Sequence, residues 1–315
     1  MRERNYRIHP CNNHVFMYNR TYVQHKGYRM VSGFPVTQRN SINTEGRKTR
    51  NTPYSGLMLE DVIDQIRPLP SASMLLGVCE GDDSPLIVEL ENSTSGPIVS
   101  ISDNRFSNQE FLRATLESVC GLNTKSEINI HLISPNAGVY PELINQPHLI
   151  QAYAPYDMAS WVLVDEFVKL GHERKAGLKS KPLQILAIDE MDLLVQDFEQ
   201  DLLKQFQWLL EIGPDLNMWV LANISSKRIR REFMPLLNSF RTKIFGRIES
   251  PIESSQIVGR PFLDLSTHFP GVDYTIRTGE EDIKITLPQT KNVAYSHRIE
   301  NLASEDLDEF WNAMV

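Results

Sequence analysis

Short apolar runs alternate with longer amphipathic segments over most of the chain after residue 56. Four of these runs predict buried strands, because each is almost continuously aliphatic and is bounded by polar or turn residues. They are PIVSIS (97–102), INIHLIS (128–134), LQILAIDE (183–190) and LNMWVLANIS (216–225). Strands that are apolar along their whole length are typical of a parallel sheet whose two faces are both covered. The pattern therefore predicts an α/β fold with a mostly parallel sheet and helices on both faces.

The amphipathic segments between these strands predict the covering helices. In 159–175 the residues Trp161, Val164 and Val168 fall on one helical face. The stretch 191–212 is apolar at helical spacing throughout, so we expect one long helix that ends at Gly213 and Pro214. Shorter helices are predicted at 56–66 and after residue 107. The stretch 135–150 is rich in Pro, Asn and Gly and is predicted to be a loop.

The remaining strands are predicted as hairpins and one single strand. The segment 73–90 contains two apolar runs joined by an acidic turn, in which Gly81 supplies the bend. A further strand is expected within 239–250, and 271–288 predicts a C-terminal β-hairpin that turns at 278–281.

Charge is distributed unevenly along the 315 residues. The chain has a net charge of −8, but residues 1–50 hold ten Lys and Arg against two acidic residues, so that the remainder is strongly acidic. We expect a basic N-terminal arm (1–55), one large domain (56–290) and a C-terminal tail with a short helix (291–315). The arm, which ends in Arg47, Lys48 and Arg50, is predicted either to contact nucleic acid or an acidic partner or to be simply solvated.

Cysteine usage and hydropathy indicate the compartment. The three cysteines, Cys11, Cys79 and Cys120, are too few and too scattered for a disulfide framework, and no cleavable apolar leader is visible. Apolar runs such as WVLV fall far short of the ~20 residues that cross a bilayer. These features predict a cytoplasmic protein with no direct membrane insertion.

Two strand ends hold the candidate chemistry, because ligands of parallel sheets bind beyond the carboxyl ends of strands. One strand leads into SDNRFSNQE (102–110), and another ends at Asp189 and Glu190. In phosphate-loop ATPases these places hold the glycine-rich loop and two acids, one of which holds Mg²⁺ while the next activates water. The alternative is that both acids only cap the following helix.

Residues 57–290 resemble the FtsK/SpoIIIE/EssC family of translocase ATPases. The resemblance rests on the order of several stretches: the strand and helix around 98–119, PHL (147–149), LAIDE (186–190) and VLANIS (220–225). It implies a RecA-like P-loop NTPase fold, with Walker A at 102–109, Walker B at Asp189 and Glu190, and a sensor-like Asn223. It also implies oligomeric assembly, while no segment is left to encode the family's membrane anchor and winged helix.

The candidate phosphate loop departs from the family pattern at every signature position. Walker A needs G-x-x-x-x-G-K-[ST], but the corresponding residues are Ser102, Ser107, Asn108 and Gln109, with Arg105 as the only nearby cation. SNQE instead predicts a capping box, with Ser107 as N-cap and Glu110 reaching back. We therefore expect no cofactor and no metal site, and ATP with Mg²⁺ only if the protein is active.

Several cations are candidates for contact with nucleic acid or a partner. Lys227, Arg228, Arg230 and Arg231 follow the sensor-like strand, and Arg247 occupies a position that is commonly arginine in the family. Each could instead be an ordinary solvated or surface-paired residue. Ser255 replaces an arginine that is often found in the next turn, which weakens an arginine-finger interpretation.

Three functions remain open from the sequence. The first is a pseudo-ATPase that acts as a scaffold or partner-binding subunit in a DNA- or protein-translocating complex. The expected assembly is a homo- or hetero-oligomer, for which an active FtsK-like ATPase is one candidate partner. The second is an active ATP-dependent DNA translocase with an atypical phosphate loop. The third is an unrelated α/β binding domain whose basic arm contacts nucleic acid.

Overall fold

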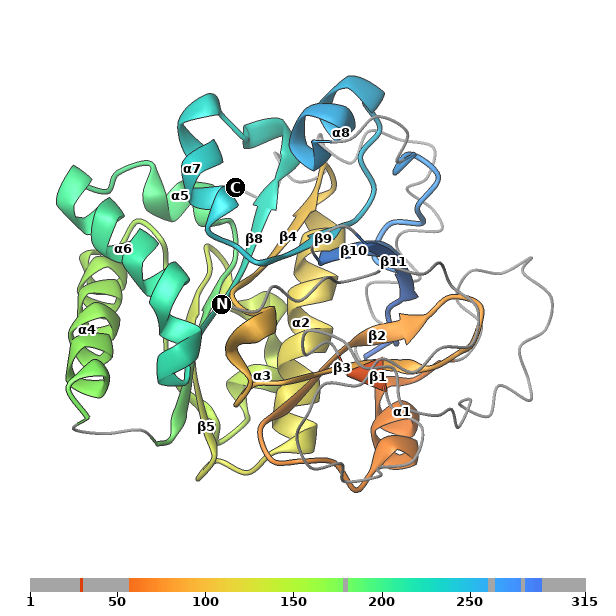
Figure 1. Ribbon diagram of the computed structural model, residues 1–315, viewed down its shortest axis with the longest axis horizontal. Coiled ribbons are helices and arrows are strands. Elements are labelled where there is room, and N and C mark those ends of the chain that lie inside the picture. The colour runs from red at the N-terminus through yellow and green to blue at the C-terminus, as the bar shows by residue number, and fades with distance from the viewer. Residues whose placement is uncertain (1–28, 31–56, 178–180, 260–263, 279–280, 291–315) are drawn as a thin grey trace, which may run out of the picture.

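The computed structural model describes residues 29–30, 57–177, 181–259, 264–278 and 281–290 (Figure 1). The predicted C-terminal tail with its short helix lies outside the described residues. So does the predicted basic arm, with Arg47, Lys48 and Arg50, apart from residues 29–30.

One sheet of eleven strands forms the centre of the described structure, in the order β1-β3-β2-β11-β10-β9-β4-β8-β7-β5-β6. The bounds are β1 (Arg29–Met30), β2 (Ser73–Cys79), β3 (Pro85–Glu89), β4 (Ile98–Ser102), β5 (Ile128–Ile133), β6 (Leu149–Tyr153), β7 (Leu183–Ile188), β8 (Met218–Ser225), β9 (Thr242–Phe245), β10 (Asp273–Thr278) and β11 (Glu281–Thr286).

The sheet has a parallel part and an antiparallel part that meet at β9. Strands β9, β4, β8, β7, β5 and β6 are parallel to one another, with Ile98 of β4 beside Leu221 of β8 and Thr242 of β9. Strands β9, β10, β11, β2 and β3 are antiparallel neighbours. The predicted mostly parallel sheet and C-terminal hairpin are confirmed, although the tip of the hairpin (279–280) lies outside the described residues.

Helices cover both faces of the sheet, as predicted (Figure 1). Their bounds are α1 (Leu59–Ile66), α2 (Arg105–Leu122), α3 (Pro141–Ile144), α4 (Met158–Lys175), α5 (Met191–Val195), α6 (Gln200–Ile212), α7 (Met234–Asn238) and α8 (Pro251–Val258). Short 3₁₀ turns are η1 (Ser93–Ser95), η2 (Ala137–Val139), η3 (Gly213–Leu216), η4 (Ser226–Arg228) and η5 (Arg231–Phe233).

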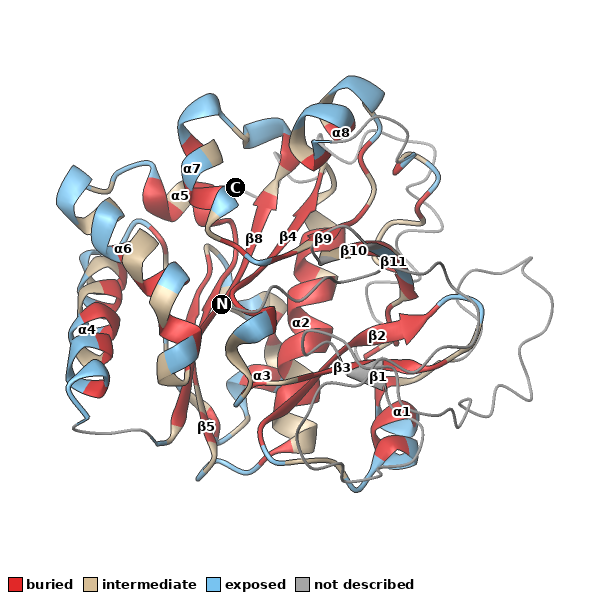
Figure 2. Ribbon diagram, in the orientation of Figure 1, coloured by how far each residue is buried: buried red, intermediate tan, exposed pale blue. Residues whose placement is uncertain are grey.

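Two large apolar clusters hold the layers together. Helices α2 and α3 pack on one face of the sheet, and α4, α5, α6 and α7 pack on the other. The central strands between them are buried, β4 and β7 at every residue and β8 at all but its last, and Figure 2 shows β4 and β8 in the colour of buried residues. This two-sided burial explains why the strands are apolar throughout rather than alternating. None of the described helices is long and apolar enough to span a membrane.

Two predictions about local structure were wrong. The stretch 191–212 forms two helices, α5 and α6, and Phe198 in the turn between them packs edge-on against Trp161 and Phe206. The predicted loop 135–150 contains η2, α3 and the start of β6. In that stretch Tyr140 and Leu143 are buried, so that packing of these two apolar side chains outweighs the local Pro and Gly content.

Candidate functional site

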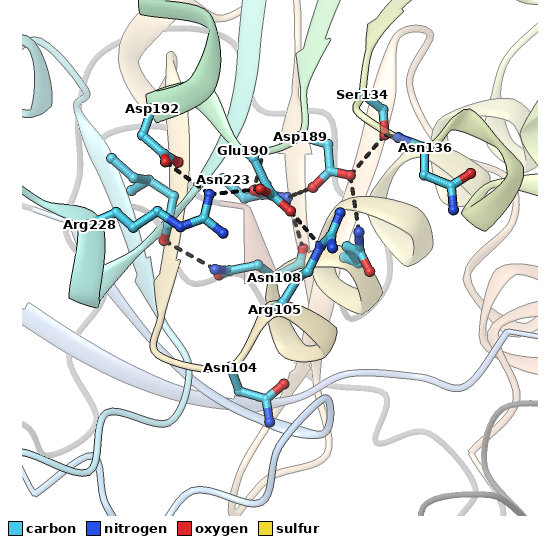
Figure 3. Close-up of polar contacts among 12 residues, drawn as sticks. Asn104, Arg105, Asn108, Ser134, Asn136, Asp189, Glu190, Asp192, Asn223 and Arg228 are labelled. Atoms are coloured by element: carbon cyan, nitrogen blue, oxygen red, sulfur yellow. Dashed lines mark hydrogen bonds and ion pairs between the residues drawn. The ribbon is translucent and has the colours of Figure 1, made fainter. Parts of the chain in front are cut away.

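Three of the predicted segments meet at the carboxyl edge of the parallel strands. Strands β4, β8 and β7 are consecutive neighbours in the sheet, so that the residues following β4 and β7 lie on either side of the end of β8. Figure 3 shows Asn108, Asp189, Glu190 and Asn223 gathered at this place. The residues predicted for the candidate site at the ends of β4, β7 and β8 therefore lie together in the structure.

Helix α2 begins earlier than the sequence predicts. Its N-cap is Asn104, whose side chain accepts from the backbone N–H of Ser107 at 3.2 Å. The predicted capping box is wrong, because the Ser107 hydroxyl accepts from the backbone N–H of Gly271 at 3.0 Å, and Glu110 pairs with Arg113. Only two residues separate the end of β4 from Arg105, the first residue of α2. The early cap thus turns most of the candidate phosphate loop into helix.

Ser102 and Asn108 fasten this turn to the sheet. The Ser102 hydroxyl donates to the backbone carbonyl of Arg247 at 2.9 Å. The Asn108 amide donates to the backbone carbonyls of Ser102, at 3.3 Å, and of Ile224, at 3.1 Å. Asn108 is buried, so that its side chain lies between the helix and the strand ends rather than in solvent.

The carboxylate of Asp189 is enclosed by three donors. Its Oδ2 accepts from the Ser134 hydroxyl at 2.9 Å and from the Gln109 amide at 3.2 Å, and its Oδ1 accepts from the Asn223 amide at 2.9 Å. Burial raises the pKa of Asp189, although these three hydrogen bonds oppose the effect and the carboxylate of Glu190 adds to it.

Glu190 adopts a left-handed backbone conformation, with φ of 58° and ψ of 62°. This region is unfavourable for a residue with a Cβ and is often found at functional sites. Asn223 holds it in place, because its side-chain oxygen accepts from the Glu190 backbone N–H at 2.7 Å. Asn223 therefore fixes both acids, one through its amide nitrogen and the other through its amide oxygen.

Two arginines hold the carboxylate of Glu190 (Figure 3). Arg105 pairs with its Oε1, and Arg228 donates to its Oε2 at 2.7 Å and also to Asp192 at 3.0 Å. Burial by itself would lower the pKa of Arg228, but the contact with Glu190 and then that with Asp192 raise it above its ordinary value. The pKa of Asp192 is raised by burial, against the effect of Arg228.

The other predicted cations lie outside this network. Lys227, Arg230 and Arg231 are exposed, and Arg230 pairs with Glu232 at 3.5 Å. Arg247 pairs with Glu249 at 3.1 Å, which agrees with the surface interpretation. The predicted basic cluster is thus divided, because Arg228 pairs with Glu190 and Asp192 while Lys227, Arg230 and Arg231 are exposed.

Sequence reasoning missed Ser134 and the pairing of Arg228 with Glu190. Ser134 directly follows β5, which is the neighbour of β7. Its position at the carboxyl end of a predicted strand could therefore have identified it as a candidate site residue. Arg228 lies at the end of the turn after β8, and its distance along the chain from Glu190 gave no signal of contact.

Comparison with known proteins identifies the fold. No family model matches the sequence, and no curated protein matches it. Among solved structures, Thermomonospora curvata EccC (ATPases 2 and 3) in complex with a signal sequence peptide has 14% identity and a TM-score of 0.55, covering 70% of this chain and 42% of that one. EssC (ATPases 2 and 3) from Geobacillus thermodenitrificans has 16% identity and a TM-score of 0.56, covering 70% and 47%.

A third neighbour is the pCW3 conjugation coupling protein TcpA in monomer form with ATPγS. It has 13% identity and a TM-score of 0.54, and the match covers 76% of this chain and 72% of that one. The chain spans less than half the length of the EccC and EssC chains. These similarities confirm the predicted RecA-like P-loop NTPase fold and its likeness to FtsK- and EssC-type ATPase domains.

Proposed function

Given this ATPase fold, we propose that the protein is a pseudo-ATPase, whose nucleotide site is closed by its own side chains and whose body serves as a scaffold or partner-binding subunit. The complex it serves would translocate DNA or protein. The proposal assigns the ATPase-like body to residues 56–290 and places the protein in the cytoplasm, without direct membrane insertion.

The hydrogen bond from Gln109 to Asp189 is the observation that supports this proposal most directly. In P-loop NTPases the residue at the position of Gln109 supplies a hydroxyl to Mg²⁺, and the acid at the end of the Walker B strand helps to hold the ion. The Gln109 amide nitrogen is a donor and cannot ligate a cation. This nitrogen contacts the carboxylate oxygen that Mg²⁺ would need, so that Mg²⁺ could bind there only after displacing Gln109.

Asn108 and Glu190 also argue against ATP hydrolysis. Asn108 stands where the phosphate-binding lysine would be, but it is neutral, buried and bonded to two backbone carbonyls. A general base for water needs a free carboxylate oxygen, whereas those of Glu190 face Arg105 and Arg228. Under this proposal Asp189 and Glu190 are structural residues that join β7 to α2 and η4.

Calorimetric titration of the full chain with MgATP tests the proposal. We expect no binding heat from the natural sequence up to about 1 mM ligand, a concentration that detects Kd values in the range ordinary for enzyme substrates. The double variant Asn108→Lys, Gln109→Ser restores the charge and hydroxyl and is expected to gain measurable affinity, while circular dichroism checks that it folds. Micromolar affinity of the natural sequence would overturn the proposal. ATP turnover that is abolished by Glu190→Gln would support the active translocase instead.

The exposed cations Lys227, Arg230 and Arg231 are the proposed contact with nucleic acid or with a partner subunit. They lie at the same edge of the sheet as the candidate site and are accessible, and such positive clusters attract phosphates and acidic surfaces. Replacing all three by Glu should abolish salt-dependent DNA binding if DNA is the ligand. If binding to DNA is unchanged by this variant, a protein partner or the N-terminal arm would be the alternative to test.

A further inference from the structure

Exposed apolar side chains are concentrated in the part of the sequence around β6. Six large hydrophobic residues are highly exposed in the described part of the chain, and five of them fall within 19 residues of sequence. Single exposed hydrophobic residues are ordinary, but a cluster marks an interaction site. The five are Ile144, Ile150, Tyr156, Met158 and Val162, and the sixth is Ile252 in α8.

Strand β6 is also an unprotected edge of the sheet. It is the last strand in the order, so that one of its sides pairs with β5 and the other pairs with no strand among the described residues. Proteins usually protect such edges with charges or proline. The β6 sequence LIQAY (149–153) contains neither. The free backbone groups of this edge can pair with an occupant that is itself an extended strand.

The surroundings of β6 indicate the charge of that occupant. Exposed acids flank the strand, with Glu142 on the side of α3 and Asp157 just before α4. An apolar strand that also contains basic residues would match both the exposed hydrophobic side chains and these carboxylates.

We propose that β6 receives residues 15–23 from the N-terminal arm of another copy of this chain. The segment VFMYNRTYV is rich in β-branched and aromatic residues, which favour strands. Arg20 lies within it and Lys26 follows it, in an arm that is basic while the body of the protein is acidic.

The topology requires that the donor be a different copy. Strand β1 (Arg29–Met30) lies at the opposite end of the eleven-stranded sheet from β6. Ten strand spacings of ~4.8 Å separate these edges by about 48 Å along the sheet. The six residues from Val23 to Arg29 reach only about 20 Å when fully extended. A copy therefore cannot place this segment on its own β6, and the contact joins different copies of the chain. The inference does not depend on whether the protein binds nucleotide.

Disulfide trapping in the full chain tests the contact directly. Two differently tagged populations are mixed in a Cys11→Ser background, one with Tyr18→Cys and the other with Ile150→Cys, and are then oxidised. We expect a mixed dimer that contains both tags, and a matched mixture of Tyr18→Cys with Ile252→Cys should give none. Absence of the mixed dimer, with Tyr22→Cys in place of Tyr18→Cys as well, would overturn the proposal. Cross-linking of Ile150→Cys to itself alone would also overturn it, because two β6 edges would then meet.

Sedimentation of the unmodified chain provides the second measurement. Ile150 is 45% exposed, so we expect the fold to tolerate Ile150→Lys, which places a cation in the path of the basic arm. We expect Ile150→Lys to weaken self-association at least tenfold, and Ile252→Lys, at a 71% exposed position in α8, to leave it unchanged. A natural chain that is monomeric at 100 μM, or equal association of both variants, would contradict the inference.

Discussion

The side-chain amide of Gln109 donates to Oδ2 of Asp189 at 3.2 Å and so connects the first turns of α2 to the end of β7. Both side chains are buried, and Asp189 also accepts from Ser134 and Asn223. Buried carboxylates are costly unless they are fully hydrogen-bonded. The hydrogen bonds around Asp189 are therefore predicted to contribute to the free energy of unfolding.

Replacing Gln109 by Glu should destabilise the fold in a pH-dependent manner. The substitution places a second buried carboxyl group beside Asp189, and two adjacent carboxylates resist double ionisation. We expect a loss of about 2–4 kcal/mol in the free energy of unfolding at pH 8 and a smaller loss at pH 5, where one proton is shared. Urea denaturation at both pH values measures this. Gln205→Glu, at an exposed position of α6, is the control and should show no such difference.

A comparison of the variants Glu190→Gly and Glu190→Ala separates the energetic cost of the left-handed backbone from the loss of the ion pairs with Arg105 and Arg228. Both variants lose the contacts with Arg105 and Arg228, but only glycine adopts φ of 58° without a steric cost. We expect the Gly variant to be more stable than the Ala variant by about 1 kcal/mol. Chemical denaturation of the two proteins side by side provides the comparison. If the Ala variant were as stable as the Gly variant, the left-handed conformation of Glu190 would be refuted.

Ionisation of Glu117 should lower the free energy of unfolding as the pH rises from acidic to neutral values. Burial raises the pKa of Glu117 to about 7, against the effect of Arg113 and with a further contribution from Glu142. Between pH 4.5 and 7 the folded state holds this proton more tightly than the unfolded state, so that stability is lost over this window as pH increases. We expect Glu117→Gln to be more stable than the natural chain by on the order of 2 kcal/mol at pH 8.

The gain from Glu117→Gln should disappear near pH 4, where the carboxyl group is protonated in both states. Thermal unfolding between pH 4 and pH 8 measures the difference. Glu173→Gln, at an exposed position of α4, serves as the matched control. A gain that is constant with pH would show that the effect does not come from ionisation.

Gly96 should tolerate no side chain. A Cβ at this position would lie 2.2 Å from Cζ3 of Trp219, whose ring is buried and whose indole N–H donates to the carbonyl of Leu90 at 2.8 Å. Gly96→Ala must therefore displace the indole, with an expected cost of about 3 kcal/mol. Unfolding followed by tryptophan fluorescence measures the loss. Gly138→Ala, which would meet only the side-chain oxygen of Asn136 at 3.0 Å, should cost far less.

The sequence contained enough information for the sheet and for the acids at its edge. Strands that are buried on both faces have a strong signal, and Asp189 and Asn223 could be placed because strand ends are visible in the sequence. The extra antiparallel pairing of β2 with β11 was not visible, because it joins residues about two hundred positions apart. Pairing over such distances is decided by packing rather than by local composition.

The start of helix α2 in the candidate site depends on which of two nearby polar residues acts as its N-cap. Asn104 and Ser107 are both good N-caps, and the sequence favoured Ser107 because Glu110 completes a capping box. In the structure Glu110 instead pairs with Arg113, which is itself buried, and Ser107 is left to accept from Gly271. The contact between Ser107 and the distant Gly271 therefore helps to determine that Asn104, rather than Ser107, caps helix α2.

The position of β4 has a consequence for biosynthesis. Its two neighbours are β8 and β9, where Leu221 and Thr242 flank Ile98, and both strands emerge from the ribosome more than a hundred residues after β4. Until then its apolar side chains have no strand to pair with, and non-local pairing is slow to form. The nascent chain therefore exposes an aggregation-prone segment for much of its translation, and its yield in cells should depend on chaperones that hold unfinished chains.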